Sequence, residues 1–301
     1  MSLSKLKINI QSWLLRPFEI ILRSWPEKQR SIKPVWIIGA PRSGTTLTYQ
    51  LFCSFFKTSY LTNRVAERYR IALISRFFER IFFSKSLNPK SFKSKFGKTH
   101  SPNDPHEGGA FFYQFFPVEE PSAESLGINK RKKFRKLIQR LAYPSELFVS
   151  KNTVHSLRIK ALADAFPESQ FIWVTRDKAD TAYSILKARV SQKIDTKEWW
   201  GVKPPGWQER IGLTEKKRVL WQISEVETII EKDLMKTNRP FFKVSYKDVC
   251  EKPHKVMNEI AKEFGLNDYI SKDDDFIPDS FNYSTSPKDS LAEEIRILVQ
   301  N

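Results

Sequence analysis

Short apolar runs alternate along the chain with longer stretches in which apolar residues recur at helical spacing. The apolar runs have the length of buried strands and occupy residues 35–38, 147–149, 171–175 and 241–244. The helical patterns occupy residues 47–56, 157–166, 181–190, 220–230 and 254–264. Buried strands that alternate with helices predict an α/β fold, in which helices flank a parallel sheet on both faces.

The first 33 residues form a basic segment whose apolar residues, such as Trp13 and Phe18, recur at roughly helical spacing. This pattern is typical either of an interfacial helix on an anionic membrane or of a helix that packs on its own domain. Apolar residues occupy so much of the circumference that packing is favoured. No linker, repeat or low-complexity tract follows, so we expect residues 34–301 to form a single domain.

Composition narrows the class of protein. The chain has 301 residues, 51 Lys and Arg against 34 Asp and Glu, and a net charge of +17, which suits an anionic ligand, nucleic acid or membrane surface without choosing among them. Only Cys53 and Cys250 are present, which excludes a disulfide scaffold and indicates a reducing compartment. The sequence has no run of 18 apolar residues and no pattern of a signal peptide. We therefore expect a cytoplasmic protein, with peripheral membrane contact through residues 1–33 as an option.

Basic residues gather in two further segments, 64–98 and 130–140. Such runs are typical of solvated helix faces, and the alternative is an electrostatic funnel for an anionic ligand. A nucleic-acid-binding protein would also use them, but no recognisable nucleic-acid module accompanies them.

The strongest motif is a buried strand that runs into a loop rich in Gly, Ser and Thr and then into a helix. This geometry points backbone N–H groups and the positive helix end at one place, where a phosphate group can bind. Gly44 lets the backbone approach the anion closely. The residues that would contact it are Arg42, Ser43, Gly44, Thr45 and Thr46.

This loop nearly matches the phosphate motif of ATP- and GTP-binding enzymes, because Gly39 and Gly44 have the right separation. The Lys that should follow the second Gly is Thr45. We therefore interpret the loop as a nucleotide phosphate site that does not use Mg-triphosphate chemistry. A P-loop kinase or nucleotide hydrolase stays as an alternative.

A second candidate anion site follows the apolar run at 171–175. Arg176 stands at the expected carboxyl end of that strand, and Ser184 lies eight residues further on, within the next helix. Both side chains can face a ligand in the crevice there. Taken with the first loop, the pair indicates a nucleotide with two separated phosphate groups.

These residues carry a resemblance to a known family. The segment Pro41-Arg42-Ser43-Gly44-Thr45-Thr46 resembles the 5′-phosphosulfate loop of the sulfotransferase family, and the Arg176…Ser184 pair resembles that family's 3′-phosphate site. Residues 245–266 resemble its C-terminal strand and helix, so the resemblance covers about residues 33–266. The Arg-containing loop is closer to the tyrosylprotein and bacterial branches than to the cytosolic branch. The resemblance implies a sulfotransferase fold, 3′-phosphoadenosine-5′-phosphosulfate (PAPS) as the sulfuryl donor, and no catalytic metal.

The chain departs from the family where the catalytic base is expected. The cytosolic branch has a Lys-Thr-His segment, which here is Lys151-Asn152-Thr153; the bacterial branch often has a His four residues after the Lys, and His155 matches that position. The cytosolic branch's C-terminal Arg-Lys-Gly motif is not found, and Lys288 is a weak substitute.

Sulfuryl transfer needs a base for the acceptor hydroxyl and cations for the developing negative charge. We expect Arg42 to supply a cation, with Lys151 as its partner. The base is expected in the Pro- and Gly-punctuated stretch 100–109, where Glu107 resembles a Pro-x-Glu segment of related bacterial enzymes and ranks first. His106, His155 and His100 follow, and an incidental surface loop is the alternative interpretation.

The acceptor is poorly specified by the sequence. A loop at 199–207 contains Trp199, Trp200 and Trp207, whose rings can stack on sugars or simply pack. Asp273–Asp275 lacks the spacing of a calcium loop and is expected to be a solvated loop. We expect transfer of a sulfuryl group to a hydroxyl of a glycan or a related metabolite.

Overall fold

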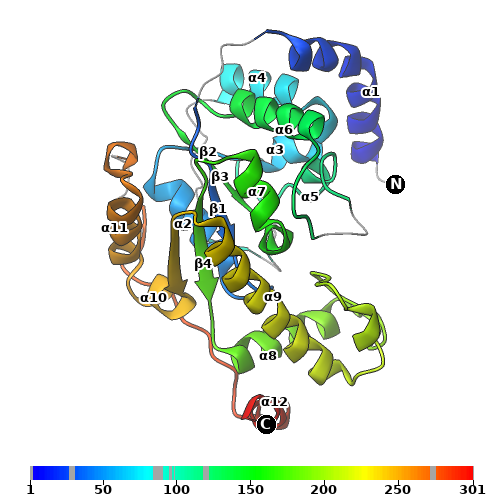
Figure 1. Ribbon diagram of the computed structural model, residues 1–301, viewed down its shortest axis with the longest axis vertical. Coiled ribbons are helices and arrows are strands. Elements are labelled where there is room, and N and C mark those ends of the chain that lie inside the picture. Colours follow the sequence, from blue (N-terminus) through cyan, green and yellow to red (C-terminus); the bar gives the residue numbers. More distant parts are fainter. Residues whose placement is uncertain are drawn as a thin grey trace.

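Five parallel strands form the centre of the molecule, in the order β2-β3-β1-β4-β5 (Figure 1). The structure is a computed structural model that describes residues 3–26, 31–83, 91–94, 97, 99–117, 122–271 and 276–300. The strands are β1 (Val35–Ile38), β2 (Thr58–Ser59), β3 (Leu147–Lys151), β4 (Gln170–Thr175) and β5 (Phe241–Ser245). The four apolar runs are therefore all strands. The two-residue β2 was not predicted, because no apolar run in the sequence coincides with it.

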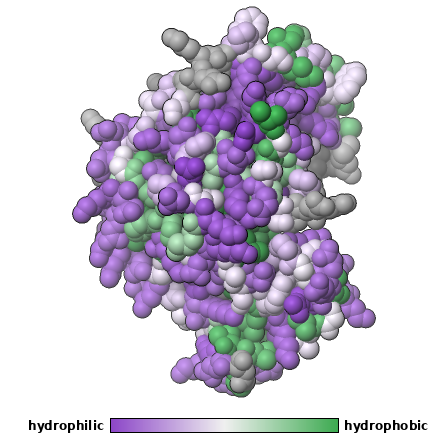
Figure 2. Space-filling model, in the orientation of Figure 1, coloured by the Kyte–Doolittle hydropathy of each residue, from purple (hydrophilic) through white to green (hydrophobic). Residues whose placement is uncertain are grey.

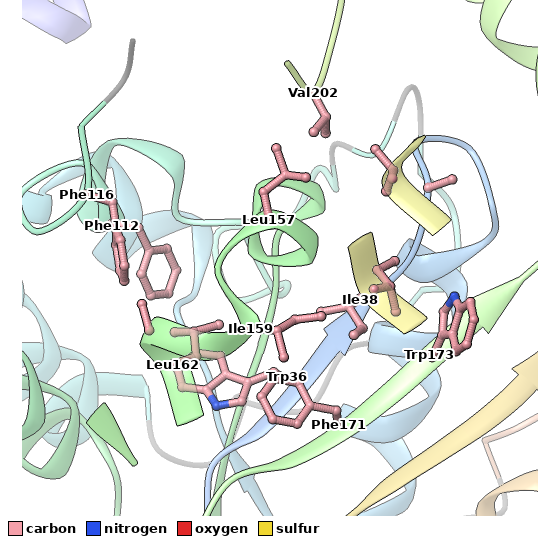
Figure 3. Close-up of a cluster of buried hydrophobic side chains, with 14 of the residues drawn as sticks. Trp36, Ile38, Phe112, Phe116, Leu157, Ile159, Leu162, Phe171, Trp173 and Val202 are labelled. Atoms are coloured by element: carbon pink, nitrogen blue, oxygen red, sulfur yellow. The ribbon is translucent and has the colours of Figure 1, made fainter. Parts of the chain in front are cut away.

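The sheet is buried on both faces because successive side chains of each strand enter different cores. Trp36 and Ile38 of β1 belong to one hydrophobic cluster, whereas Val35 and Ile37 belong to the other. Figure 3 shows Trp36 of the first cluster among aromatic and aliphatic side chains from the sheet and from the helices that cover it. The Trp36 indole donates a hydrogen bond of 2.9 Å to the Ser169 hydroxyl, which satisfies its buried N–H.

Helices cover both faces of the sheet, as expected. Those that contribute to the first cluster include α5 (Gly109–Phe112), α6 (Ile128–Leu141), α7 (Ile159–Ala165), α8 (Lys178–Ser191) and α9 (Glu215–Thr237). Those that contribute to the second are α2 (Thr45–Phe55), α10 (Tyr246–Glu251) and α11 (Pro253–Phe264). The helix expected at 157–166 is divided into a 3₁₀ helix, Thr153–Leu157, and α7.

The remaining helices lie at the two ends of the molecule (Figure 1). They are α1 (Leu3–Ser24), α3 (Asn63–Glu67), α4 (Ala72–Phe83) and α12 (Ser290–Gln300). Elsewhere along the chain, 3₁₀ helices occur at Tyr69–Ile71, Gln208–Arg210 and Asn267–Tyr269. None of the helices in the described part of the chain contains a stretch apolar and long enough to cross a membrane.

The N-terminal helix α1 contacts the domain through polar side chains. The Glu19 carboxylate is fully buried and accepts hydrogen bonds from the backbone N–H groups of Leu73 (3.3 Å) and Ile74 (3.1 Å), in the first turn of α4. Arg23, one turn along α1, donates to the same carboxylate at 2.8 Å. A carboxylate at a helix N-terminus is favourable, so this contact fixes α1 against α4.

Candidate active site

The loop between β1 and α2 carries the groups expected to bind a phosphate. Gly44 takes a left-handed conformation (φ 99°) and stands at the N-cap of α2, where it offers no side chain to the first N–H groups of the helix. A Cβ at Gly44 would lie 2.0 Å from the Tyr246 ring, so only glycine fits here. These N–H groups and the helix dipole thus point to the place where an anion would bind.

Ser43 shows that this loop has unused binding capacity. Its hydroxyl oxygen is buried and has no hydrogen-bond partner among the described residues. A buried hydroxyl without a partner is costly in a folded protein, and a bound anion would satisfy it. Arg42 precedes it with a left-handed backbone (φ 66°), a conformation that is uncommon for a residue with a side chain and that clusters at functional sites.

Lys151 brings a buried cation to the loop. It lies at the carboxyl end of β3, and its ammonium group donates to the Thr46 hydroxyl at 3.0 Å and forms an ion pair with the Glu107 carboxylate. The Lys151 side chain is only 3% exposed, whereas that of Glu107 is 32% exposed. The Asn152 amide donates to the Glu107 backbone carbonyl at 3.1 Å, which holds this segment beside β3. Glu107 is therefore both fixed by its partners and reachable from the cavity.

Arg42, Ser184 and Arg176 form a second polar cluster. The Arg42 Nε donates to the Ser184 hydroxyl at 3.1 Å, and Arg176 donates to the Arg42 backbone carbonyl at 3.2 Å. Burial and the nearby Arg176 cation lower the pKa of Arg42 below its ordinary value. Two guanidinium groups held this close favour an anion between or beside them.

Both clusters open into one cavity of about 280 Å³ at the carboxyl ends of β1, β3 and β4. This position is the usual ligand crevice of an open α/β sheet. The residues around the cavity are Pro41, Arg42, Gly44, Thr45, Thr46, Leu47, Ser94, Gly97, Glu107, Lys151, Thr153, Arg176, Ser184, Trp200, Gly201, Tyr246 and Ser284. Nine of the eleven site residues named from the sequence, counting Ser43 with its loop, thus belong to this region, and His106 and His155 do not.

The histidine candidates lie elsewhere. His155 is fully buried, with its ring edge-on to Phe112 (4.4 Å between centroids) and Trp36 (5.4 Å), and burial lowers its pKa well below the ordinary value. His155 therefore lies in the core and does not line the cavity. His106 accepts a hydrogen bond of 2.8 Å from the Gly108 N–H and lines a different depression together with His100.

Several residues around the cavity were not singled out as site residues. Tyr246 begins α10 directly after β5, and its ring lies 5.0 Å from the Arg176 guanidinium; burial raises its pKa to about 12, so the hydroxyl stays protonated. Ser284 accepts a hydrogen bond of 2.5 Å from Arg176 through its backbone carbonyl. The position of Tyr246 directly after a predicted strand could have indicated that it lies near the cavity. No feature of the local sequence indicates the same for Ser284.

The tryptophan loop divides between packing and the cavity. The Trp199 and Trp207 rings pack against each other with centroids 5.4 Å apart, and Trp199 also contacts Trp221 at 6.0 Å. Trp200 instead lines the cavity, and Gln222 donates to its backbone carbonyl at 2.9 Å. Of these three tryptophans, Trp200 is thus the one that lines the cavity.

The described Lys and Arg side chains of the two basic segments do not line this cavity, although Ser94 and Gly97 of the first segment do. Arg76 pairs with Glu79 at 2.5 Å, and the Arg80 guanidinium lies 3.8 Å from the centroid of the Tyr143 ring. In α6, Arg131 pairs with Asp164 at 2.5 Å and Arg135 with Glu168 at 3.4 Å. Lys85, Lys90, Lys95 and Lys98 lie outside the described residues, as do Asp273–Asp275. Within the described ranges, no group of three or more His, Cys, Asp or Glu residues is arranged to hold a metal ion.

Comparison with known proteins gives consistent matches. A model of the "Sulfotransferase family" matches residues 34–269. The omega-hydroxy-beta-dihydromenaquinone-9 sulfotransferases Stf3 of Mycobacterium bovis and Mycobacterium tuberculosis are 24% identical over 201 residues, which are 65% of this chain and 48% of theirs. The chain thus spans about half the length of these curated relatives. The crystal structure of sulfotransferase STF9 from Mycobacterium avium has the same fold, with a TM-score of 0.50 and 17% identity over 96% of this chain and 72% of that one.

Proposed function

Because this chain belongs to the sulfotransferase family, we propose that it transfers a sulfuryl group from PAPS to an acceptor hydroxyl. One observation carries the proposal: a single cavity holds two clusters of anion-binding groups, one around Lys151 and the α2 N-terminus and one around Arg176 and Ser184, and Arg42, which belongs to the loop before α2, contacts the second. PAPS has two separated phosphate-bearing positions, so it suits such a cavity. The buried Ser43 hydroxyl supports the fit, since it has no partner within the described chain.

In the proposed reaction the acceptor oxygen attacks sulfur, the bond between sulfur and the phosphate oxygen breaks, and the acceptor's proton passes to a base. Arg42, Lys151 and the N–H groups of Thr45 and Thr46 stabilise the negative charge on the transferring group and on the leaving phosphate oxygen. Arg176 and Ser184 bind the 3′-phosphate. The cations are already fixed by hydrogen bonds, so little reorganisation is needed in the transition state.

We propose Glu107 as the base. It is the only one of the four candidates from the sequence that lines the cavity in the described part of the chain. Its ion pair with Lys151 links the base to the cation that would stabilise the leaving group. Acceptor binding would exclude water from the part of this carboxylate that is now exposed and strengthen its basicity.

We propose a glycan hydroxyl as the acceptor. Trp200 at the cavity supports this, because indole rings stack on sugar rings. A hydroxyl on a lipid is a second candidate. It is supported by the curated relatives, which are named for a hydroxylated menaquinone, and by an exposed apolar surface on α1 and α4. Radiolabelled PAPS offered with separate glycan and prenyl-quinone alcohol pools would distinguish the two by which pool gains label.

Thermal shift tests the donor site directly. 3′-Phosphoadenosine-5′-phosphate (PAP), ATP with Mg²⁺ and an oligonucleotide are compared at equal concentration. PAP at about 100 times its Kd should stabilise the protein by about 2.7 kcal/mol. A larger shift with ATP and Mg²⁺ would favour a P-loop kinase or hydrolase, and a larger shift with the oligonucleotide would favour a nucleic-acid-binding protein.

The cysteines and the N-terminal segment bear on where the protein is located and what it contacts. Cys53 and Cys250 are both free thiols and both buried, which supports a reducing compartment such as the cytoplasm. We also propose that residues 1–33 contact an anionic membrane, and the surface that would do so extends beyond them.

A further inference from the structure

Helix α1 presents most of its apolar side chains to solvent and buries polar ones against the domain. The buried side chains of the described part of α1, Ser12 and Glu19, are both polar, and its half-buried ones are Ile8, Leu15, Arg16 and Arg23. Trp13 and Phe18 point away from the domain and are 77% and 61% exposed. A helix that only packs on its own domain has the opposite arrangement, because burial of its apolar side is what stabilises it. The apolar side of α1 is therefore available to something outside the domain.

Helix α4 continues this apolar surface. It contacts α1 through Glu19, and it leaves five large apolar side chains exposed: Phe77, Phe78, Ile81, Phe82 and Phe83. Of the 23 large hydrophobic side chains that are exposed in the described part of the chain, 14 belong to α1, Trp25 and α4. Figure 2 shows hydrophobic residues at the upper end of the molecule, where Figure 1 places these helices. Monomeric proteins rarely expose so much apolar surface in one place without a binding role.

The charges around this surface are positive. The sequences of α1, α4 and α6 contain two acidic residues, Glu19 and Glu79, and both are fully buried. Glu79 pairs with Arg76 inside the domain. On α6, in contrast, Lys130, Lys132 and Lys133 are exposed. The exposed charge of the three helices is thus entirely cationic. A partner of this surface, whether a protein or a lipid, is therefore expected to be anionic.

Two adjoining cavities beneath α1 match an amphiphilic lipid. One, of about 480 Å³ between α1 and α4, is lined mainly by apolar side chains such as Leu22, Trp25 and Phe77. The other, of about 510 Å³ between α1 and α6, is lined by five cationic side chains and no acidic one: Arg16, Arg23, Lys133, Lys136 and Arg140. Arg140 borders both. Tryptophan and phenylalanine beside a basic patch are the composition of a surface that lies in the headgroup region of a bilayer.

We infer that α1, α4 and the basic side of α6 form one docking surface for a bilayer that contains anionic lipid, with the headgroup beside Arg16, Arg140 and Lys133 and the aromatic side chains of α1 and α4 in the acyl region. This surface is independent of the donor cavity, which lies at the carboxyl ends of the strands, so it can be tested without PAPS or an acceptor. A second copy of this chain is the competing occupant.

The experiment is sedimentation of the full chain with vesicles of phosphatidylcholine alone or of phosphatidylcholine with phosphatidylglycerol. We expect binding to the anionic vesicles, weaker binding at high salt, and little binding to the neutral ones. The double variant W13S/F18S and the double variant F78S/F82S should each bind at least about tenfold more weakly, because each removes two large side chains from the acyl region. The variant K132E/K133E should weaken binding by a similar factor.

The controls use apolar side chains that are exposed elsewhere. Val190→Ser on α8 and Met235→Ser on α9 should bind vesicles like the wild type. All the mutated side chains are exposed, and thermal melting of each variant checks that it is folded. Equal binding to both kinds of vesicle, or wild-type binding by W13S/F18S and F78S/F82S, would overturn the inference. So would a wild-type dimer in sedimentation velocity that does not bind vesicles and that W13S/F18S converts to a monomer.

Discussion

Positive charge is arranged in opposite ways in two regions of the molecule. Around the cavity at the carboxyl ends of the strands, Lys151 is buried and Arg42 is half-buried, and each is held in place by a side-chain hydrogen bond, to Thr46 and Ser184 respectively. On the outer side of α6, Lys132 and Lys133 are exposed. The first arrangement fixes the geometry of the cations, and the second leaves them free to adapt.

The two groups of cations differ in the dielectric constant of their surroundings and in the conformational entropy of their side chains. A charge that is partly removed from water and held in one rotamer interacts strongly with an anion at one position, whereas exposed lysines are screened by salt and act as a diffuse field. The cavity is therefore suited to selecting one ligand and stabilising a transition state. The outer surface is suited to attracting any anionic interface. Substitutions in the two regions should accordingly differ by orders of magnitude in their effect on turnover.

The largest effect is expected from Arg42→Ala. Removing one charged donor from the charge that develops in the transition state should lower turnover by about 10²- to 10³-fold. Lys132→Ala, which removes an exposed cation, is the control and should keep wild-type turnover. Steady-state rates of label transfer from PAPS measure both. Near-normal turnover of the Arg42 variant would contradict a role of Arg42 in the transition state. It would also contradict the expected difference in effect between the two regions.

Glu107→Gln should lower turnover by about 10²-fold or more, because the amide keeps the shape of the side chain but cannot take a proton. PAP affinity, measured by calorimetry, should change little, since Arg42, Arg176 and Ser184 are untouched. His106→Ala is the matched control from the same loop and should stay active. If the His106 variant is inactive and the Glu107 variant is not, the base is the histidine.

Arg176→Ala should act on the ligand more than on the chemical step. The wild type should prefer PAP to AMP by at least about tenfold, because charge-assisted hydrogen bonds to the 3′-phosphate distinguish the two. The variant should lose most of that preference. Lys288→Ala is the control, since Lys288 is exposed near Ser284 but does not line the cavity. Equal calorimetric affinities of the wild type for PAP and AMP would contradict the assignment of Arg176 and Ser184.

The fold and most of the residues that line the cavity were predictable from the sequence, for a local reason. Apolar runs and helical spacing are short-range patterns, and the loop that follows β1 owes its shape to Gly44 and the start of α2. The edge strand β2 gave no such pattern, because its two residues pair with β3 without an apolar run of their own. Ser284 was not predictable either, because it reaches the cavity only through a contact with Arg176, 108 residues away in sequence.

The surroundings of His155 could not be predicted from the sequence pattern. The resemblance matched it to a histidine that follows a lysine by four residues, but a 3₁₀ helix follows β3 and turns His155 into the core. Lys151 meets polar partners at the end of the strand, whereas His155 meets Trp36 and Phe112. The pattern along the chain cannot tell these two directions apart, because they depend on the path of the backbone after Asn152.

The smallest expected effect comes from the burial of His155. It concerns the stability of the folded protein and not turnover. Burial lowers the pKa of His155 in the folded protein well below its ordinary value of about 6.5. The unfolded chain therefore binds a proton in a pH range where the folded chain does not. Stability is fully present above about pH 6.5 and is lost as the pH falls below that value toward the folded-state pKa.

The variant His155→Leu lacks this proton-linked loss. Urea denaturation at pH 7.5, 6.5 and 5.5 should show that the free energy of unfolding of the wild type, measured relative to that of the variant, decreases by about 1 kcal/mol between pH 6.5 and 5.5. His100→Leu, which removes an exposed imidazole, should follow the pH dependence of the wild type. Parallel curves for the wild type and the His155 variant would contradict a neutral, buried His155. They would also return this histidine to consideration as a titrating group near Lys151, because only a side chain that exchanges protons freely in the folded state could leave the two curves parallel.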